Sequence, residues 1–218
     1  MRIVKNILIF GIATLFICCT INKPKNTSSE HQIKWSENLI GDFSFADKWS
    51  YAEGIYLNTY NQLSCDGLCP PRIGAMKDKN GKIIADSLES FYSIVDTSHL
   101  YHSLRSTNKM YEYSGTHFIN FTEKDNKIIG KTNTNVSTHS SLTIELEKNK
   151  FNAFVDLNSI RDLGTHRFPL SKGELEIDSI KYRKGIIKAH FDFEFLNTID
   201  STKKLLWKGQ IISRIEKE

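Results

Sequence analysis

The sequence predicts an all-β fold of mostly antiparallel strands, arranged as a β-sandwich or a barrel-like sheet with one or two short helices. Ile186 to Leu196 is the clearest strand, because every second residue is apolar and the residues between them are polar. The apolar positions are Ile187, Ala189, Phe191, Phe193 and Phe195. Similar alternation recurs in about nine or ten segments separated by polar turns, which is enough for two layers or a closed sheet. An α+β fold is the alternative.

The first eighteen residues have the order of a secretory signal peptide. Arg2 and Lys5 form a basic head, and Ile7 to Ile17 is an almost unbroken apolar run. This run has eleven residues, whereas a helix that spans a bilayer needs about 20. We therefore expect residues 1–18 to direct export and to be removed.

The end of this segment, Leu15-Phe16-Ile17-Cys18-Cys19, resembles the lipobox of bacterial lipoproteins. In that family a cysteine that follows a small residue becomes the lipidated first residue of the mature chain. The resemblance implies lipidation of Cys19, since Cys18 is smaller than Ile17. It also implies a protein of the bacterial cell envelope, held at a membrane by its lipid and facing the periplasm or the cell surface. An uncleaved anchor or a plain signal peptide is the alternative.

Composition fits one folded domain after the signal peptide. Charged residues make up 25% of the chain and hydrophobic residues 39%, as in ordinary globular proteins. The formal net charge of +4 includes Arg2 and Lys5, so the mature chain carries only about +2. Such a weak charge, without a basic stripe in the sequence, argues against a nucleic-acid partner.

Residues 19–32 are predicted to be a flexible tether, and residues 33–218 a single β-rich domain. The tether is polar and contains Pro24 and the run Thr27-Ser28-Ser29. The domain begins with a stretch rich in aromatic residues, in which Ser50 to Leu57 is expected to form a first strand.

Cys65 and Cys69 flank an Asp-Gly turn that two prolines follow. If Cys18 is removed and Cys19 is acylated, these two cysteines remain as a pair, and an exported chain favours a disulfide between them. A disulfide that closes so small a loop would add only ~2 kcal/mol to the free energy of unfolding. The main effect of this disulfide would be to fix the shape of the loop. A redox pair or half of a metal site is the alternative.

One helix is predicted from Asp86 to Val95. Asp86 or Ser87 can cap its first turn, and Leu88, Phe91, Tyr92 and Val95 share one helical face. Three histidines and a carboxylate follow closely in sequence, and these residue types hold zinc or a similar divalent ion: His99, His102, Glu112 and His117. Ordinary hydrogen-bonded or exposed histidines are the alternative. No other cofactor is predicted.

The rest of the chain is predicted to be a succession of hairpins. Two of them turn at residues 123–126 and at Lys148-Asn149-Lys150. A longer connection is expected from Asn158 to Lys172, because it contains Gly164 and Pro169. A meander then follows, with strands from Glu174 to Tyr182, Ile186 to Leu196 and Leu205 to Ile215. Burying the apolar surface of each phenylalanine in the middle strand should stabilise the fold by about 2 kcal/mol, so we expect the core to lie there.

The leading functional hypothesis is a non-catalytic binding module for an envelope protein or a small ligand. Rigid segments rich in Tyr and Trp make contact area at low entropic cost, so the candidate binding residues are Trp49, Tyr51, Tyr56, Tyr60 and Leu68. One alternative is an exported metal-dependent hydrolase that uses the histidines named above. Another is a structural or immunity-type lipoprotein that only occludes a partner. The sequence contains no nucleophile elbow, phosphate-binding loop or dinucleotide fingerprint.

Overall fold

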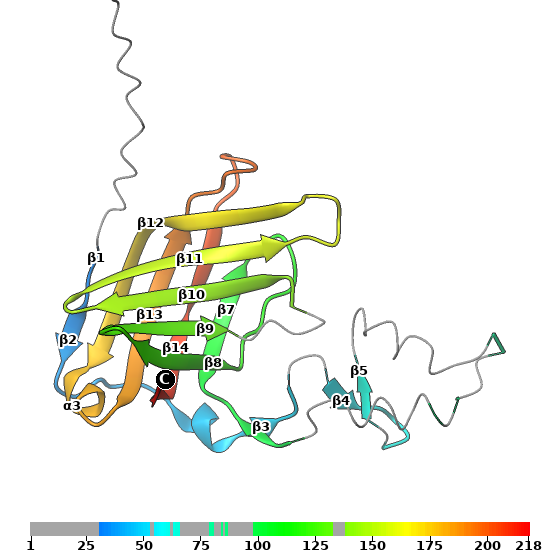
Figure 1. Ribbon diagram of the computed structural model, residues 1–218, viewed down its shortest axis with the longest axis horizontal. Coiled ribbons are helices and arrows are strands. Elements are labelled where there is room, and N and C mark those ends of the chain that lie inside the picture. The colour runs from blue at the N-terminus through cyan, green and yellow to red at the C-terminus, as the bar shows by residue number, and fades with distance from the viewer. Residues whose placement is uncertain are drawn as a thin grey trace, which may run out of the picture.

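Seven strands close into a barrel in the computed structural model, which describes residues 31–52, 55–61, 63–65, 79–80, 84, 86, 98–132 and 138–218 (Figure 1). The backbone alone is described for residues 63–65. The barrel strands are β8 (Ile119–Lys124), β9 (Lys127–Thr132), β10 (Ser140–Glu147), β11 (Lys150–Asn158), β12 (Thr165–Asp178), β13 (Ile186–Phe195) and β14 (Leu205–Lys217). The predicted all-β fold is confirmed, in its barrel-like form.

Two long strands turn the sheet through the corners of the barrel. The first half of β12 pairs with β11, and its second half pairs with β13 after a register shift between Leu170 and Lys172. β14 pairs with the whole of β13 through Leu205 to Arg214, and its last three residues, Ile215 to Lys217, pair in parallel with β8. This parallel contact closes the ring, so the seven barrel strands leave no open edge within it.

Shorter elements surround the barrel. β7 (Leu104–Lys109) adds to the outer side of β14, while β1 (His31–Gln32) and β2 (Lys34–Ser36) pair with β11 and β12. Two small two-stranded sheets are formed by β3 (Trp49–Ser50) with β6 (Leu100–Tyr101), and by β4 (Ile55–Leu57) with β5 (Leu63–Cys65). A 3-10 turn, η1 (Ser44–Asp47), and the short helix α3 (Ser179–Tyr182) complete the described elements. No helix in this part of the chain is long and apolar enough to cross a bilayer.

Side chains fill the barrel interior. Phe121, Phe168, Phe193 and Trp207 are all fully buried, and the rings of Phe191 and Phe193 lie 4.9 Å apart. Gly130 leaves room for one of these rings, because a Cβ at this position would lie only 2.3 Å from Cε1 of Phe121. The interior is therefore a packed core, as expected for a small barrel.

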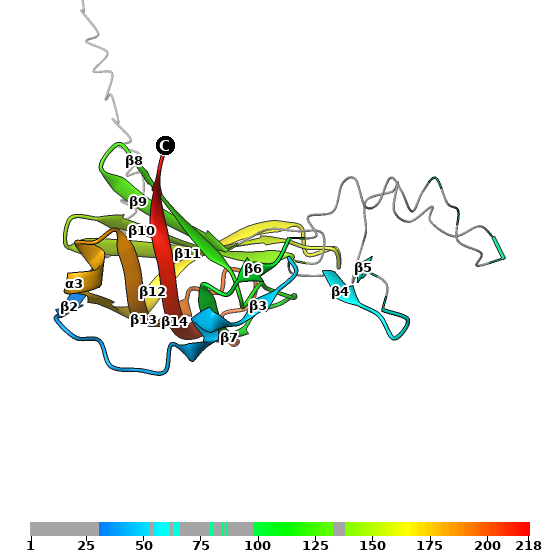
Figure 2. The ribbon, with the colours of Figure 1, turned by 90° about the horizontal axis from the view of Figure 1, so that it is seen from below.

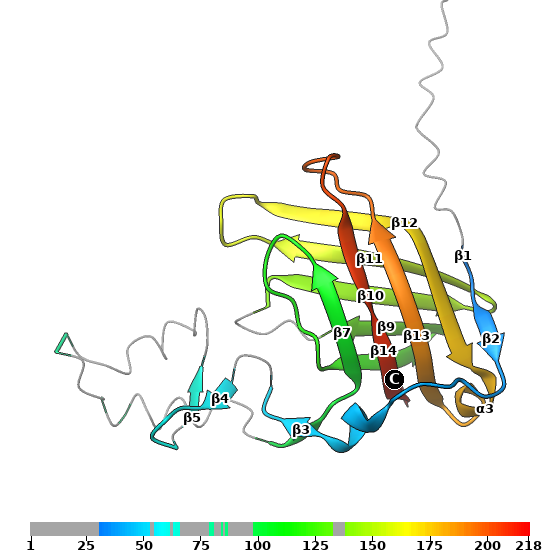
Figure 3. The same cartoon turned by 180° about the vertical axis from the view of Figure 1, so that it is seen from behind.

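A segment before β3 crosses the outer face of β13 and β14 (Figure 3). Phe43 stacks on His190 with ring centroids 5.4 Å apart, and the Lys188 amine donates to the carbonyl of Leu39 over 2.8 Å. Arg105 on β7 pairs with Asp42 over 2.7 Å. This segment therefore partly covers His190 on the outward face of β13.

Several predicted boundaries are wrong in informative ways. β1 begins at His31, so the last two residues of the predicted tether are already paired with β11. The connection expected from Asn158 to Lys172 is shorter, because β12 begins at Thr165 and buries Phe168 and Leu170. The strand expected from Glu174 to Tyr182 ends at Asp178, whose carboxylate accepts from the Lys181 N–H over 2.9 Å and caps α3.

The strand expected from Ser50 to Leu57 is described as two short strands, β3 and β4, in different sheets. Other predictions fall on residues that the structure does not describe. These are the lipidation of Cys19, the helix beyond Asp86, the binding role of Leu68 and the Cys65–Cys69 disulfide. For the disulfide, the side chain of Cys65 and all of Cys69 lie outside the described part. They stay predictions.

Candidate binding surface

Exposed aromatic residues gather on the ribbon formed by β3 and β6. Trp49 faces Tyr101 in the register of this antiparallel pair, and Ser50 faces Leu100. Residues directly opposite each other share a face, and successive residues alternate between faces. Trp49, Tyr51, His99 and Tyr101 therefore belong to one face of the ribbon, and Ser50 and His102 to the other.

Ring contacts hold the outer face in one arrangement. Trp49 stacks on His99 with ring centroids 3.6 Å apart and an interplanar angle of 15°. Tyr51 approaches both rings edge-on, at 5.8 Å from Trp49 and 5.5 Å from His99. Trp49 nevertheless remains 47% exposed and Tyr101 67% exposed. We call the four residues Trp49, Tyr51, His99 and Tyr101 the aromatic–histidine surface.

The inner face attaches the ribbon to the barrel. Nε2 of His102 lies 3.1 Å from Oγ of Ser50, and the His102 ring lies 4.6 Å from that of His117, which precedes β8. The N–H groups of Ser103 and Leu104 both donate to the carbonyl of His117. Ser103 also donates through its hydroxyl to the carbonyl of Ile119 over 2.8 Å. The aromatic–histidine surface is thus fixed to the start of β8 by hydrogen bonds.

The surroundings of the two inner histidines favour their neutral forms. Burial lowers the pKa of His102 below its ordinary value, and the neighbouring His117 and Lys48 lower it further. Burial also lowers the pKa of His117. Neutral imidazoles suit hydrogen bonding to Ser50 and contact with Phe118, whose ring meets that of His102 edge-on at 5.5 Å.

The predicted metal ligands do not come together. His102 and His117 are neighbours, but His99 is stacked on Trp49, and Glu112 serves another part of the fold. Within the described ranges, no group of three or more His, Cys, Asp or Glu side chains is placed to hold a metal ion. The structure therefore does not bring His99, His102, Glu112 and His117 together, and a metal ion at these residues stays an untested prediction.

Glu112 instead orders the loop between β11 and β12. Its carboxylate accepts from the Ser159 hydroxyl over 2.5 Å and from the Ile160 N–H over 3.1 Å. Burial opposes the ionisation of Glu112, but these hydrogen bonds and the nearby His139 outweigh it and hold the pKa of this carboxyl below its usual value. A carboxylate with these partners has a structural role.

The predicted binding residues divide into two groups. Trp49 and Tyr51 belong to the aromatic–histidine surface, whereas Tyr56 and Tyr60 lie on the separate β4–β5 hairpin, where Tyr60 is 82% exposed. Sequence reasoning missed Tyr101. Its alternation with His99 along β6 was the available signal, but it becomes meaningful only when β3 is known to be the partner strand.

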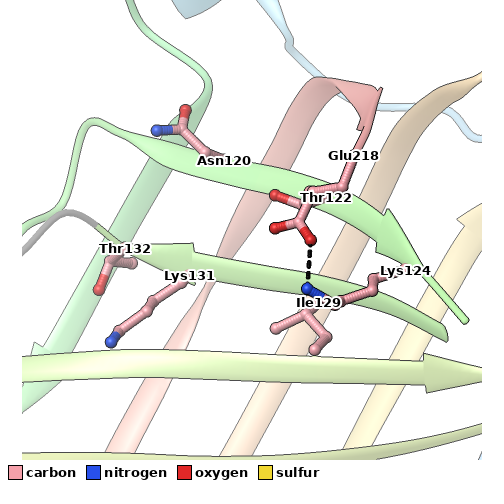
Figure 4. Close-up of a pocket in the computed structure, with 7 residues that line it drawn as sticks. All are labelled: Asn120, Thr122, Lys124, Ile129, Lys131, Thr132 and Glu218. Carbon is pink, nitrogen blue, oxygen red and sulfur yellow. Dashed lines mark hydrogen bonds and ion pairs between the residues drawn. The ribbon is translucent and has the colours of Figure 1, made fainter.

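A second surface feature is an open depression of about 380 Å³ on the outer side of β8 and β9 (Figure 4). It is lined by Asn120, Thr122, Lys124, Ile129, Lys131, Thr132 and Glu218. The Lys124 amine and the Glu218 carboxylate lie 2.6 Å apart across it and neutralise each other. Apart from this ion pair and Ile129, its lining consists of polar side chains and the charged Lys131, so the depression has no apolar floor for a ligand.

Three comparisons with known proteins found no match for the chain, whether among family models, curated proteins or solved structures.

Proposed function

We propose that the protein is a lipid-anchored, non-catalytic binding module of the bacterial cell envelope that recognises a protein partner through the aromatic–histidine surface. The observation that supports this most directly is the stacked Trp49–His99 pair beside the exposed Tyr101. Large aromatic side chains held rigid before binding lose little entropy in a complex, and they dominate the energetics of protein interfaces.

The filled barrel supports recognition on the outside. A small barrel can hold a ligand only when its interior leaves a cavity, and here Phe121, Phe168, Phe193 and Trp207 occupy that space. Recognition therefore falls to surface elements, and the β3–β6 ribbon presents aromatic side chains that the core does not need.

Site-specific photo-cross-linking in living cells tests this function. The full chain is expressed in an exporting bacterium with benzoylphenylalanine in place of Tyr101, or, as the control, in place of Leu196, which is comparably exposed elsewhere on the barrel. We expect a discrete cross-linked protein at position 101 and none at position 196.

A second substitution makes the experiment specific. Trp49→Ala should cost about 2 kcal/mol or more of binding free energy and remove the cross-link at position 101. Tyr113→Ala, at another exposed tyrosine, should leave it unchanged. Cross-links of equal strength at both positions, or a product insensitive to Trp49→Ala, would contradict the proposal.

A further inference from the structure

The first described strands, β1 and β2, pair with the barrel at one of its ends. This end lies away from the β3–β6 ribbon. β1 pairs with the beginning of β11, and the Ile33 N–H donates to the carbonyl of Asn149 in the β10–β11 turn over 2.9 Å. β2 then pairs with the last residues of β12, immediately before α3. The β10–β11 turn and α3 therefore lie on either side of β1 and β2 at this end of the barrel (Figures 1 and 3).

This end carries exposed positive charge. Lys148 lies in the β10–β11 turn, and Lys181, Arg183 and Lys184 lie on α3 and the turn that follows it. Across the described residues, none of these four side chains takes part in an ion pair. Ile180, between them, is 41% exposed although it is apolar. We call Lys148, Ile180, Lys181, Arg183 and Lys184 the basic end.

The acidic residues nearby do not cancel this charge. Residues 180–185 contain three positive side chains and no negative one. Glu147 is held by Lys127 over 3.3 Å, Glu218 is held by Lys124 over 2.6 Å, and the buried carboxylate of Asp178 accepts from the Lys181 N–H. Further carboxylates at this end include Glu37, which follows β2, and Glu123, Asp125 and Glu216. The positive charge is therefore concentrated around α3 and the β10–β11 turn.

We propose that the basic end docks on the anionic lipid headgroups of the membrane that holds the anchor. This inference rests on the proposed lipidation of Cys19. Only the eleven residues Thr20 to Glu30 separate that cysteine from β1, and a chain of this length reaches at most about 40 Å. Basic side chains are attracted to an anionic bilayer within a Debye length of its surface, and an exposed isoleucine among them can enter the headgroup region.

Docking in this way orients the proposed recognition site. β8 runs from Ile119, next to the hydrogen bonds that hold the β3–β6 ribbon, to Lys124 at the basic end (Figure 2). Six residues of extended strand span about 20 Å. With the basic end on the membrane, the aromatic–histidine surface stands clear of the lipid and remains open to a partner protein.

Vesicle sedimentation tests the inference without the lipid anchor on Cys19. The chain from Thr20 to Glu218 contains every described element and carries no lipid. It is mixed with phosphatidylcholine vesicles with or without about one third phosphatidylglycerol. We expect binding only to the anionic vesicles at about 0.05 M salt, and its loss at about 0.5 M salt. Absence of binding to the anionic vesicles would overturn the inference, whatever the outcome of cross-linking at position 101.

Charge reversal locates the contact. A variant with glutamate at all four basic positions, Lys148, Lys181, Arg183 and Lys184, should bind anionic vesicles at least tenfold more weakly. The matched control reverses four exposed lysines elsewhere on the surface that also take part in no ion pair with described residues, Lys109, Lys131, Lys172 and Lys208, and it should bind within about twofold of the original chain. Glutamine in place of glutamate provides a second variant if the reversal impairs folding, which thermal unfolding would reveal. Equal losses in the two sets would contradict docking through the basic end.

Discussion

Gly130 and Phe121 show how a single residue shapes the core. A Cβ at position 130 would lie 2.3 Å from the ring of Phe121. Because this ring is fully buried, relieving the overlap would require the strand backbone or the surrounding core to move. We expect Gly130→Ala to lower the free energy of unfolding by about 1–3 kcal/mol, as overpacking does elsewhere. Chemical denaturation measures this change.

A second substitution separates steric overlap from backbone effects. Phe121→Leu costs stability by itself but makes room at position 130, so the double variant should lose clearly less than the sum of the two single losses. Additive losses would mean that the overlap with Phe121 is not the cause.

His102 and His117 make stability depend on pH. Burial keeps their folded-state pKa values below the ordinary 6.5, so the unfolded chain binds more protons just below that pH. The contribution of these two groups to the free energy of unfolding should therefore be complete above about pH 6.5. It should be lost as the pH drops through the lowered pKa values. Half-buried His190, whose pKa is also lowered, contributes in the same direction.

Urea titrations at about pH 7.5 and about pH 5.5 measure this dependence. The double variant with glutamine at His102 and His117 should show a smaller change between the two conditions. An unchanged pH dependence in the double variant would show that these two groups are not its source.

At the scale of elements, hairpins were the part of the fold that the sequence could predict. The turn predicted at residues 123–126 lies between β8 and β9, where Asp125 and Asn126 have φ values of 51° and 63°, which these residue types tolerate. Alternation fixes which residues share a face, and turn residues fix where the chain reverses. Neither indicates that β14 will pair with β8, about ninety positions away in sequence. Closure of the barrel therefore had to come from the structure.

The candidate site was predictable to a similar degree. The density of aromatic residues pointed to Trp49 and Tyr51, whereas Tyr101 required knowledge of the β3–β6 pairing. Glu112 was grouped with the histidines because sequence proximity does not show where a carboxylate points. Its hydrogen bonds to the β11–β12 loop decide its role.

The β11–β12 loop should depend on that carboxylate. Glu112→Gln removes the charge and one acceptor, leaving the Ser159 hydroxyl or the Ile160 N–H poorly satisfied, and such losses cost about 1–3 kcal/mol. Hydrogen exchange should become faster at Ile160 and Leu163 while β13 stays protected. Glu147→Gln, at an exposed ion pair, is the control and should change neither. Faster exchange throughout the barrel would instead indicate a global role.

At the scale of the whole molecule, the packed barrel separates two surfaces of different composition. One end carries Lys148 and the basic residues around α3, and the β3–β6 ribbon near the start of β8 carries exposed aromatic side chains. Both proposed contacts depend on the chain being exported and held at a membrane through Cys19. That anchorage is the central claim.

Intact-mass measurement of the full chain, purified from the membranes of an exporting bacterium, tests it most directly. We predict a chain that begins at Cys19, carries a diacylglycerol group on that cysteine, and is lighter by two hydrogens because Cys65 and Cys69 are bonded. Replacing Cys19 with serine should abolish the lipid mass while export continues. A mature chain without lipid, or an uncleaved chain that begins at Met1, would contradict the account.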